Sequence, residues 1–110
     1  MTDPAFDTLK RLRFPLLLVS NEGLIVFASD AAQRVLLGIE IVSMPISCFV
    51  FDWERIRPVR RDPAIVDAEI FGRDGEYLAV KAVVFQLRSG GRWLSGLAIG
   101  NVDEPVQAIR

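Results

Sequence analysis

The second half of the chain constrains the fold most, because its hydrophobic residues follow the period of a β-strand. Residues 66–70 and 77–87 alternate apolar and polar side chains, and residues 92–102 follow as a third strand. Glycine-containing turns at residues 72–75 and 89–91 separate the three segments. In the middle strand, Leu78, Val80, Ala82 and Val84 share one face, and Tyr77, Lys81 and Phe85 share the other. The pattern predicts a three-stranded antiparallel meander.

The first half predicts a short helix followed by a hairpin. Asp3 can cap a helix with Pro4 at its first position, so residues 1–13 form an N-terminal amphipathic helix. Residues 15–20 and 24–28 are two β-rich apolar runs joined by the turn tripeptide Asn21-Glu22-Gly23. We therefore expect two more antiparallel strands.

A second helix and an irregular middle complete the predicted order of elements. Ser29 or Asp30 is placed to cap a helix over residues 31–37, which Gly38 would end. Residues 40–63 are interrupted by prolines, so we expect loops with one or two helical turns there. The order predicts an α+β fold with an antiparallel sheet and short helices on one face.

Composition excludes several classes of function. The 13 Lys and Arg residues against 14 Asp and Glu residues give a net charge of -1, which disfavours nucleic acid as a partner. The single cysteine rules out an intramolecular disulfide, and the absence of histidine argues against metal sites and histidine-based triads. No apolar run reaches the roughly 18 residues of a membrane span, and the N-terminus lacks a signal peptide. We therefore expect a cytoplasmic domain with no membrane contact.

The ordered combination of motifs resembles the PAS sensory-domain family. In residues 14–38 a first strand, an acidic-glycine turn, a second strand, an alanine-rich helix and a terminating glycine follow as they do at the opening of that family. Asn101-Val102-Asp103-Glu104 is similar to the Asp-Ile-Thr-Glu signature at which such domains pass into a signalling helix. The resemblance implies a PAS-like five-stranded antiparallel sheet over residues 14–103, with residues 104–110 starting a C-terminal linker helix.

The resemblance also implies a function in bacterial signalling. It predicts a non-enzymatic sensory and dimerisation module that relays a signal to an attached output domain, such as the histidine kinase of a two-component system. Asn101 and Asp103 are then the residues at the signal output. The proline-broken middle argues against a roomy cofactor pocket, so we expect no cofactor. The alternative is a receptor for a small molecule or cofactor that uses the region of Cys48, Trp53 and the arginines.

Cys48 lies where flavin-binding photosensory members of that family carry a reactive thiol. Its neighbours here are apolar, whereas those members surround the thiol with Asn, Arg and Gln. Free cysteine usually packs as a small buried hydrophobe. We therefore predict that Cys48 is buried and unreactive.

An arginine-rich segment is the best candidate for an anion site. Trp53 precedes Arg55, Arg57, Arg60 and Arg61, and guanidinium groups bind phosphates and carboxylates through paired hydrogen bonds. Acidic residues within the same segment nearly balance this charge, which favours a solvated loop.

Four aromatic residues could line a small apolar pocket between the sheet and the middle loops, or they could simply fill the core. They are Phe49, Phe51, Phe85 and Trp93. The residues expected at a ligand site are thus Cys48, Phe51, Trp53, Arg57, Arg60, Phe85 and Trp93.

The N-terminal helix predicts a homodimer. Phe6, Leu9 and Leu12 form an apolar stripe on a helix too short to be stable alone in water. The outward sheet face, with Val83 and Phe85, offers more apolar surface than this helix would cover. A symmetric contact between two copies is the commonest solution for such surface.

Overall fold

The computed structural model describes residues 11, 13–36, 40–72 and 75–100. The predicted N-terminal helix with Phe6, Leu9 and Leu12, and the C-terminal segment with Asn101 and Asp103, lie outside these residues.

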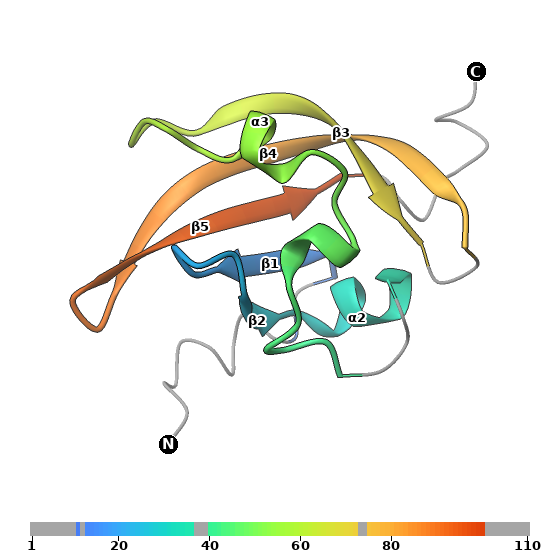
Figure 1. The fold of residues 1–110 in the computed structure, drawn as a ribbon, viewed down its shortest axis with the longest axis horizontal. Helices are drawn as coiled ribbons and strands as arrows, with labels where there is room; N and C mark the ends of the chain where they lie inside the picture. Colours follow the sequence, from blue (N-terminus) through green and yellow to red (C-terminus); the bar gives the residue numbers. More distant parts are fainter. Residues whose placement is uncertain (1–10, 12, 37–39, 73–74, 101–110) are drawn as a thin grey trace.

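The architecture is an open five-stranded antiparallel sheet in the order β2-β1-β5-β4-β3 (Figure 1). The strands are β1 (Leu16–Val19), β2 (Ile25–Ala28), β3 (Ala64–Phe71), β4 (Tyr77–Ser89) and β5 (Arg92–Ile99). The helical elements are α2 (Asp30–Leu36), the 3-10 turn η1 (Ile46–Cys48) and α3 (Trp53–Ile56). The predicted α+β fold with an antiparallel sheet is confirmed.

The meander β3-β4-β5 forms as the period of two predicts. β4 pairs with β3 from Tyr77 and with β5 up to Ser89, where Ser89 lies opposite Arg92. Gly90 and Gly91 both have positive φ, at 58° and 77°, in the two-residue turn between β4 and β5. Turns of this kind match the twist of a hairpin, and glycine adopts them without steric cost. The tip of this hairpin extends beyond the other strands (Figure 1).

Ser29 begins helix α2 and connects it to the first strand. Its Oγ accepts hydrogen bonds from the backbone N–H groups of Ala32 at 3.2 Å and Leu16 at 2.9 Å, and the hydroxyl donates to the carbonyl of Phe14 at 3.1 Å. Of the two caps that the sequence allowed, Ser29 is the one that contacts the helix. Its side chain is fully buried with these partners satisfied.

The irregular middle covers the outer edges of the sheet. The N–H of Phe51 donates to the carbonyl of Glu69, and the N–H of Phe71 donates to that of Phe49, at 2.9 and 2.7 Å. On the opposite edge the N–H of Ile25 donates to the carbonyl of Met44 at 2.9 Å. These bonds occupy backbone groups that would otherwise be open to pairing with another chain.

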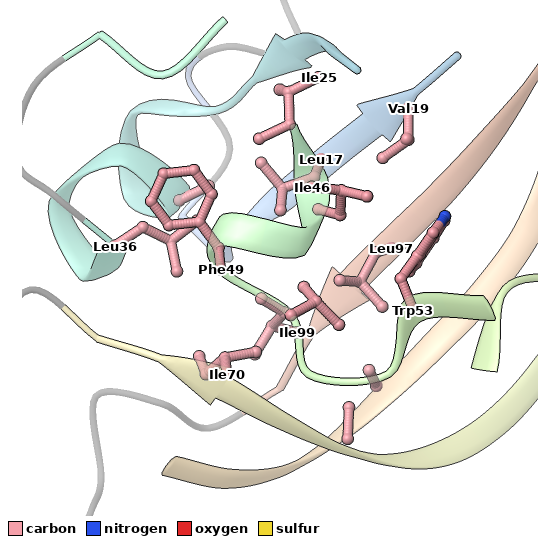
Figure 2. Close-up of a cluster of buried hydrophobic side chains, with 14 of the residues drawn as sticks. Leu17, Val19, Ile25, Leu36, Ile46, Phe49, Trp53, Ile70, Leu97 and Ile99 are labelled. Carbon is pink, nitrogen blue, oxygen red and sulfur yellow. The ribbon is translucent and has the colours of Figure 1, made fainter. Parts of the chain in front are cut away.

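The main core lies between the helical elements and one face of the sheet (Figure 2). Phe49 and Trp53 from the middle segment pack with Leu36 of α2 and with Leu97 and Ile99 of β5. The helices therefore gather on one face, as predicted. A second, smaller cluster lies on the other face and consists of Leu16, Leu18, Phe27 and Leu94, with Phe85, Leu87 and Ala98 packed against it.

The ring of Phe85 lies directly over Gly96 in that second cluster. The two residues are opposite one another in the β4-β5 pairing. A Cβ on Gly96 would stand only 2.2 Å from Cζ of Phe85. Glycine is therefore required at this position for the ring to lie flat on the sheet.

Candidate functional site

The arginine-rich segment contributes one side of a surface groove beside β3 and β4. The groove has a volume of about 380 Å³, with Val66 and Val84 on its sheet side. Arg57 and Arg60, both expected at a ligand site, line it together with Asp62. The remaining lining residues are Arg55, Ile56, Pro58, Val59, Pro63 and Ala64. The groove thus combines an apolar wall with guanidinium groups, which suits an anion that carries an apolar body.

Two of the arginines are already paired with neighbouring carboxylates. Nε of Arg55 lies 3.0 Å from Oδ2 of Asp52, and Nη1 of Arg57 lies 3.3 Å from Oε1 of Glu54. Both pairs are exposed and three residues apart in sequence, so each stabilises the fold only weakly. Ion pairs with nearby acidic residues therefore neutralise part of the positive charge of this segment, as the sequence predicted.

Trp53 is buried in the core and does not lie on the surface beside these arginines. Its side chain is 6% exposed and belongs to the main core, where Figure 2 shows it beside Leu97. Helix α3 buries Trp53 and Ile56 and leaves Glu54 and Arg55 outside. A ligand held by the arginines could therefore not stack on Trp53 without rearrangement of the core.

Cys48 is exposed, so the prediction that it is buried is wrong. The physical reason is the 3-10 geometry of η1, in which residues three apart lie on the same side. Ile46 and Phe49 occupy the inward side and are each 2% exposed, which turns Cys48 toward solvent. The predicted lack of reactivity rests on burial, so the exposure of Cys48 removes its reason, and we now expect the thiol to be accessible to reagents.

A second hollow, of about 280 Å³, lies at Cys48 near the start of β4. The rings of Phe51 and Tyr77 meet edge to face with centroids 6.2 Å apart, and those of Phe71 and Tyr77 lie 5.2 Å apart. Ser47, Phe49, Val50 and Asp52 complete the lining. We call Phe51, Phe71 and Tyr77 the aromatic cluster.

The four aromatics considered for a pocket do not converge on one site. Phe49 fills the main core, and Phe51 is half exposed in the aromatic cluster. Phe85 lies on the opposite face of the sheet, and Trp93 is near the tip of the β4-β5 hairpin. The expected ligand residues are therefore spread over several places. The groove brings together Arg57 and Arg60, and the second hollow brings together Cys48 and Phe51.

Sequence reasoning missed the convergence of two arginines on Trp93. The guanidinium carbons of Arg61 and Arg88 lie over the indole ring, 5.6 and 5.7 Å from its centroid. Arg88 is directly opposite Trp93 in the hairpin register. The two-residue turn predicts that register, so the sequence carried a signal for the Arg88 contact.

The described residues contain neither a cluster suited to a metal ion nor a helix suited to span a membrane. Among the described residues, no three His, Cys, Asp or Glu side chains are grouped in a way that could hold a metal ion. Within the same residues, no helix has the length and apolar character that a membrane span requires.

Comparison with known proteins identifies the fold. No family model and no curated protein matches the chain. Among solved structures, it is similar to the PAS domain of an HTR-like protein from Haloarcula marismortui, with a TM-score of 0.72 and 14% identity over 89% of this chain and 88% of that one.

Two further similar PAS domains come from a sensor histidine kinase and a nitrogen regulation protein. The PAS domain of a two-component sensor histidine kinase aligns with a TM-score of 0.69 and 14% identity over 86% of this chain and 90% of that one. The PAS domain of nitrogen regulation protein NR(II) from Vibrio parahaemolyticus aligns with a TM-score of 0.68 and 14% identity, over 92% of this chain and 100% of that one. The strand order, the helices on one face and these neighbours together show that the chain has a PAS-like fold.

Proposed function

We propose that this chain is a non-enzymatic sensory module of a bacterial signal-transduction protein, which relays a signal to an attached output domain such as a histidine kinase. The observation that carries the proposal is the similarity to PAS domains of a sensor histidine kinase and of a nitrogen regulation protein, across 86% and 92% of the chain.

A domain graft tests the sensory role. Residues 1–110 would replace the PAS domain of a sensor histidine kinase, and autophosphorylation would be compared with that of the kinase lacking any PAS domain. We expect the graft to change the autophosphorylation rate, and Gly96→Val, which should disrupt the sheet, to abolish that change. A graft that behaves like the deletion would contradict the proposal.

The module acts as a homodimer in this proposal, with Phe6, Leu9 and Leu12 at the interface and Asn101 and Asp103 at the output. The support is the apolar stripe in the sequence together with Val83, which is exposed on the sheet face away from the helices. Light scattering should show a dimer at about tens of micromolar, the range in which weak interfaces form. Phe6→Glu with Leu9→Glu should give a monomer, whereas Arg11→Glu, an exposed charge change nearby, should not.

The groove beside β3 and β4 favours a second candidate function, as a receptor for a small anion with an apolar body. Arg57 and Arg60 would bind the anion, and Val66 and Val84 would contact the apolar part. Calorimetric titration with octanoate and with inorganic phosphate tests this. Arg57→Ala with Arg60→Ala should cost about 1.5 to 3 kcal/mol of binding free energy for each lost charge-assisted bond, whereas Arg92→Ala should change little. No heat with the unmodified protein would exclude both probes.

A further inference from the structure

The tip of the β4-β5 hairpin carries a cationic surface built around one exposed tryptophan. Arg61, from the loop before β3, and Arg88, near the end of β4, both contact the indole of Trp93. Trp93 is nevertheless 38% exposed, and both arginines are exposed. We call these three residues the arginine-tryptophan cluster.

The two arginines of this cluster have no acidic partner among the residues that the structure describes. The ion pairs of this region include Asp52 with Arg55, Glu54 with Arg57 and Asp67 with Lys81, and none of them involves Arg61 or Arg88. Asp62 follows Arg61 directly and is the nearest acid in sequence, but it makes no ion pair within the described residues. The cluster therefore presents two positive charges whose hydrogen-bonding capacity is still available.

Packing on the indole holds the guanidinium groups in defined positions. A guanidinium over an aromatic face is attracted by the π-system, and its N–H edges stay free to bind carboxylates through paired hydrogen bonds. Less side-chain freedom is then lost when a partner binds. Tryptophan and arginine are also the residue types that contribute most binding energy at protein interfaces.

We propose that Arg61, Arg88 and Trp93 form a docking surface for an acidic segment of a partner protein. Carboxylates spaced along the segment would bind Arg61 and Arg88, and an apolar side chain between them would contact the open part of the indole. The cluster is open to solvent, with Trp93 38% exposed, which disfavours a small molecule because such ligands need enclosing walls. A net charge of -1 disfavours nucleic acid, whose binding depends on many phosphate contacts.

A labelled peptide of alternating glutamate and tyrosine, about ten residues long and so long enough to span both arginines, tests the proposal by fluorescence anisotropy. We expect saturable binding to the unmodified chain at about 0.15 M salt, where charges more than about 8 Å apart are largely screened. Arg61→Glu with Arg88→Glu should weaken binding at least about tenfold, because like charges then face one another. Arg61→Lys with Arg88→Lys keeps the charge but loses the planar guanidinium group, which can donate two hydrogen bonds to one carboxylate. This variant should weaken binding by about threefold or more.

The matched control is Arg13→Glu with Arg92→Glu. Both residues are exposed, and the formal charge changes by the same amount as in the first variant. Arg92 is beside Trp93 in sequence but points to the other face of the sheet by strand alternation. This control should bind within about twofold of the unmodified chain, because net charge alone acts weakly at this distance.

Four results would overturn the proposal. The first is the absence of saturable binding to the unmodified chain. The second is a loss in the control as large as that in Arg61→Glu with Arg88→Glu. The third is equally tight binding of a peptide with glutamine in place of glutamate. The fourth is tighter binding of an oligothymidylate of similar length or of vesicles rich in anionic lipid, which would assign the surface to nucleic acid or membrane.

Discussion

The two ends of the β3-β4-β5 meander both expose aromatic side chains but surround them differently. At the β3-β4 end, the aromatic cluster packs ring against ring, with Tyr77 60% exposed. At the β4-β5 end, Trp93 is 38% exposed and its neighbours are Arg61 and Arg88. The first end offers an apolar surface, and the second offers a cationic one.

This difference leads us to expect that the aromatic cluster contributes to folding and that the arginine-tryptophan cluster contributes to the binding we propose. Ring-to-ring contacts remove apolar area from water and stabilise the folded chain. Exposed guanidinium groups stabilise it little, because water solvates them equally well in the unfolded state. We therefore expect substitutions at the aromatic cluster to change the free energy of unfolding, and those at the arginine-tryptophan cluster to change association.

The largest effect should come from Gly96→Val, which disrupts the sheet that joins the two ends. Its side chain would overlap the ring of Phe85, where a Cβ already comes within 2.2 Å of Cζ. We expect a loss of about 3 kcal/mol in the free energy of unfolding, measured by urea denaturation.

Gly100→Ala is the matched control for that variant. A Cβ at Gly100 would meet only the carbonyl oxygen of Lys81, at the ordinary contact distance of 3.5 Å. It should change the unfolding free energy by no more than about 0.5 kcal/mol. A Gly96→Val protein as stable as this control would show that the ring of Phe85 moves aside freely.

Tyr77→Ala should give the next largest effect, because Tyr77 contacts both other rings of the aromatic cluster. The expected loss is about 1 kcal/mol of unfolding free energy, the size of an aromatic pair contribution. Tyr77→Phe keeps the ring and should be nearly neutral. Equal losses in the two variants would assign the effect to the hydroxyl group instead.

Cys48 tests the accessibility of the surface beside the aromatic cluster. Because its thiol is exposed, a disulfide reagent should label the native chain at a rate within about tenfold of the rate in urea. The label should cost less than about 0.5 kcal/mol of stability. Protection far beyond tenfold would mean that the hollow at η1 is closed in solution.

Arg61→Ala with Arg88→Ala should have the smallest effect on stability. We expect a change within about 0.5 kcal/mol, since both side chains are exposed. A loss above about 1 kcal/mol would show that this end also contributes to folding, and the contrast between the two ends would fail.

The sequence predicts the sheet well because strand period and turn chemistry act locally. The meander, the first hairpin and the helix after Ser29 all follow from alternation, glycine turns and capping. The sequence does not predict the orientation of Cys48. A single 3-10 turn has no period long enough to recognise, and whether η1 is 3-10 or α-helical decides which of its side chains is buried.

The candidate site is predicted less well, because it depends on contacts between distant segments. Trp53 and the arginines are neighbours in sequence, yet α3 buries Trp53 and exposes Arg55. Arg61 instead contacts Trp93, which lies 32 residues further along the chain. The conformation of the loop that places Arg61 beside Trp93 cannot be predicted from the local sequence pattern.

The three hydrogen bonds of Ser29 have a mechanical consequence. One hydroxyl group links the carbonyl of Phe14, the amide of Leu16 and the first turn of α2. A displacement of the chain at Phe14 must either carry α2 with it or break the bond to the Ser29 hydroxyl. Force applied at the N-terminal boundary of the sheet is thus transmitted to α2 through the Ser29 side chain and through the backbone bond from the N–H of Ser29 to the carbonyl of Leu16. Ser29→Ala would remove the link to Phe14 and leave only the backbone bond to Leu16.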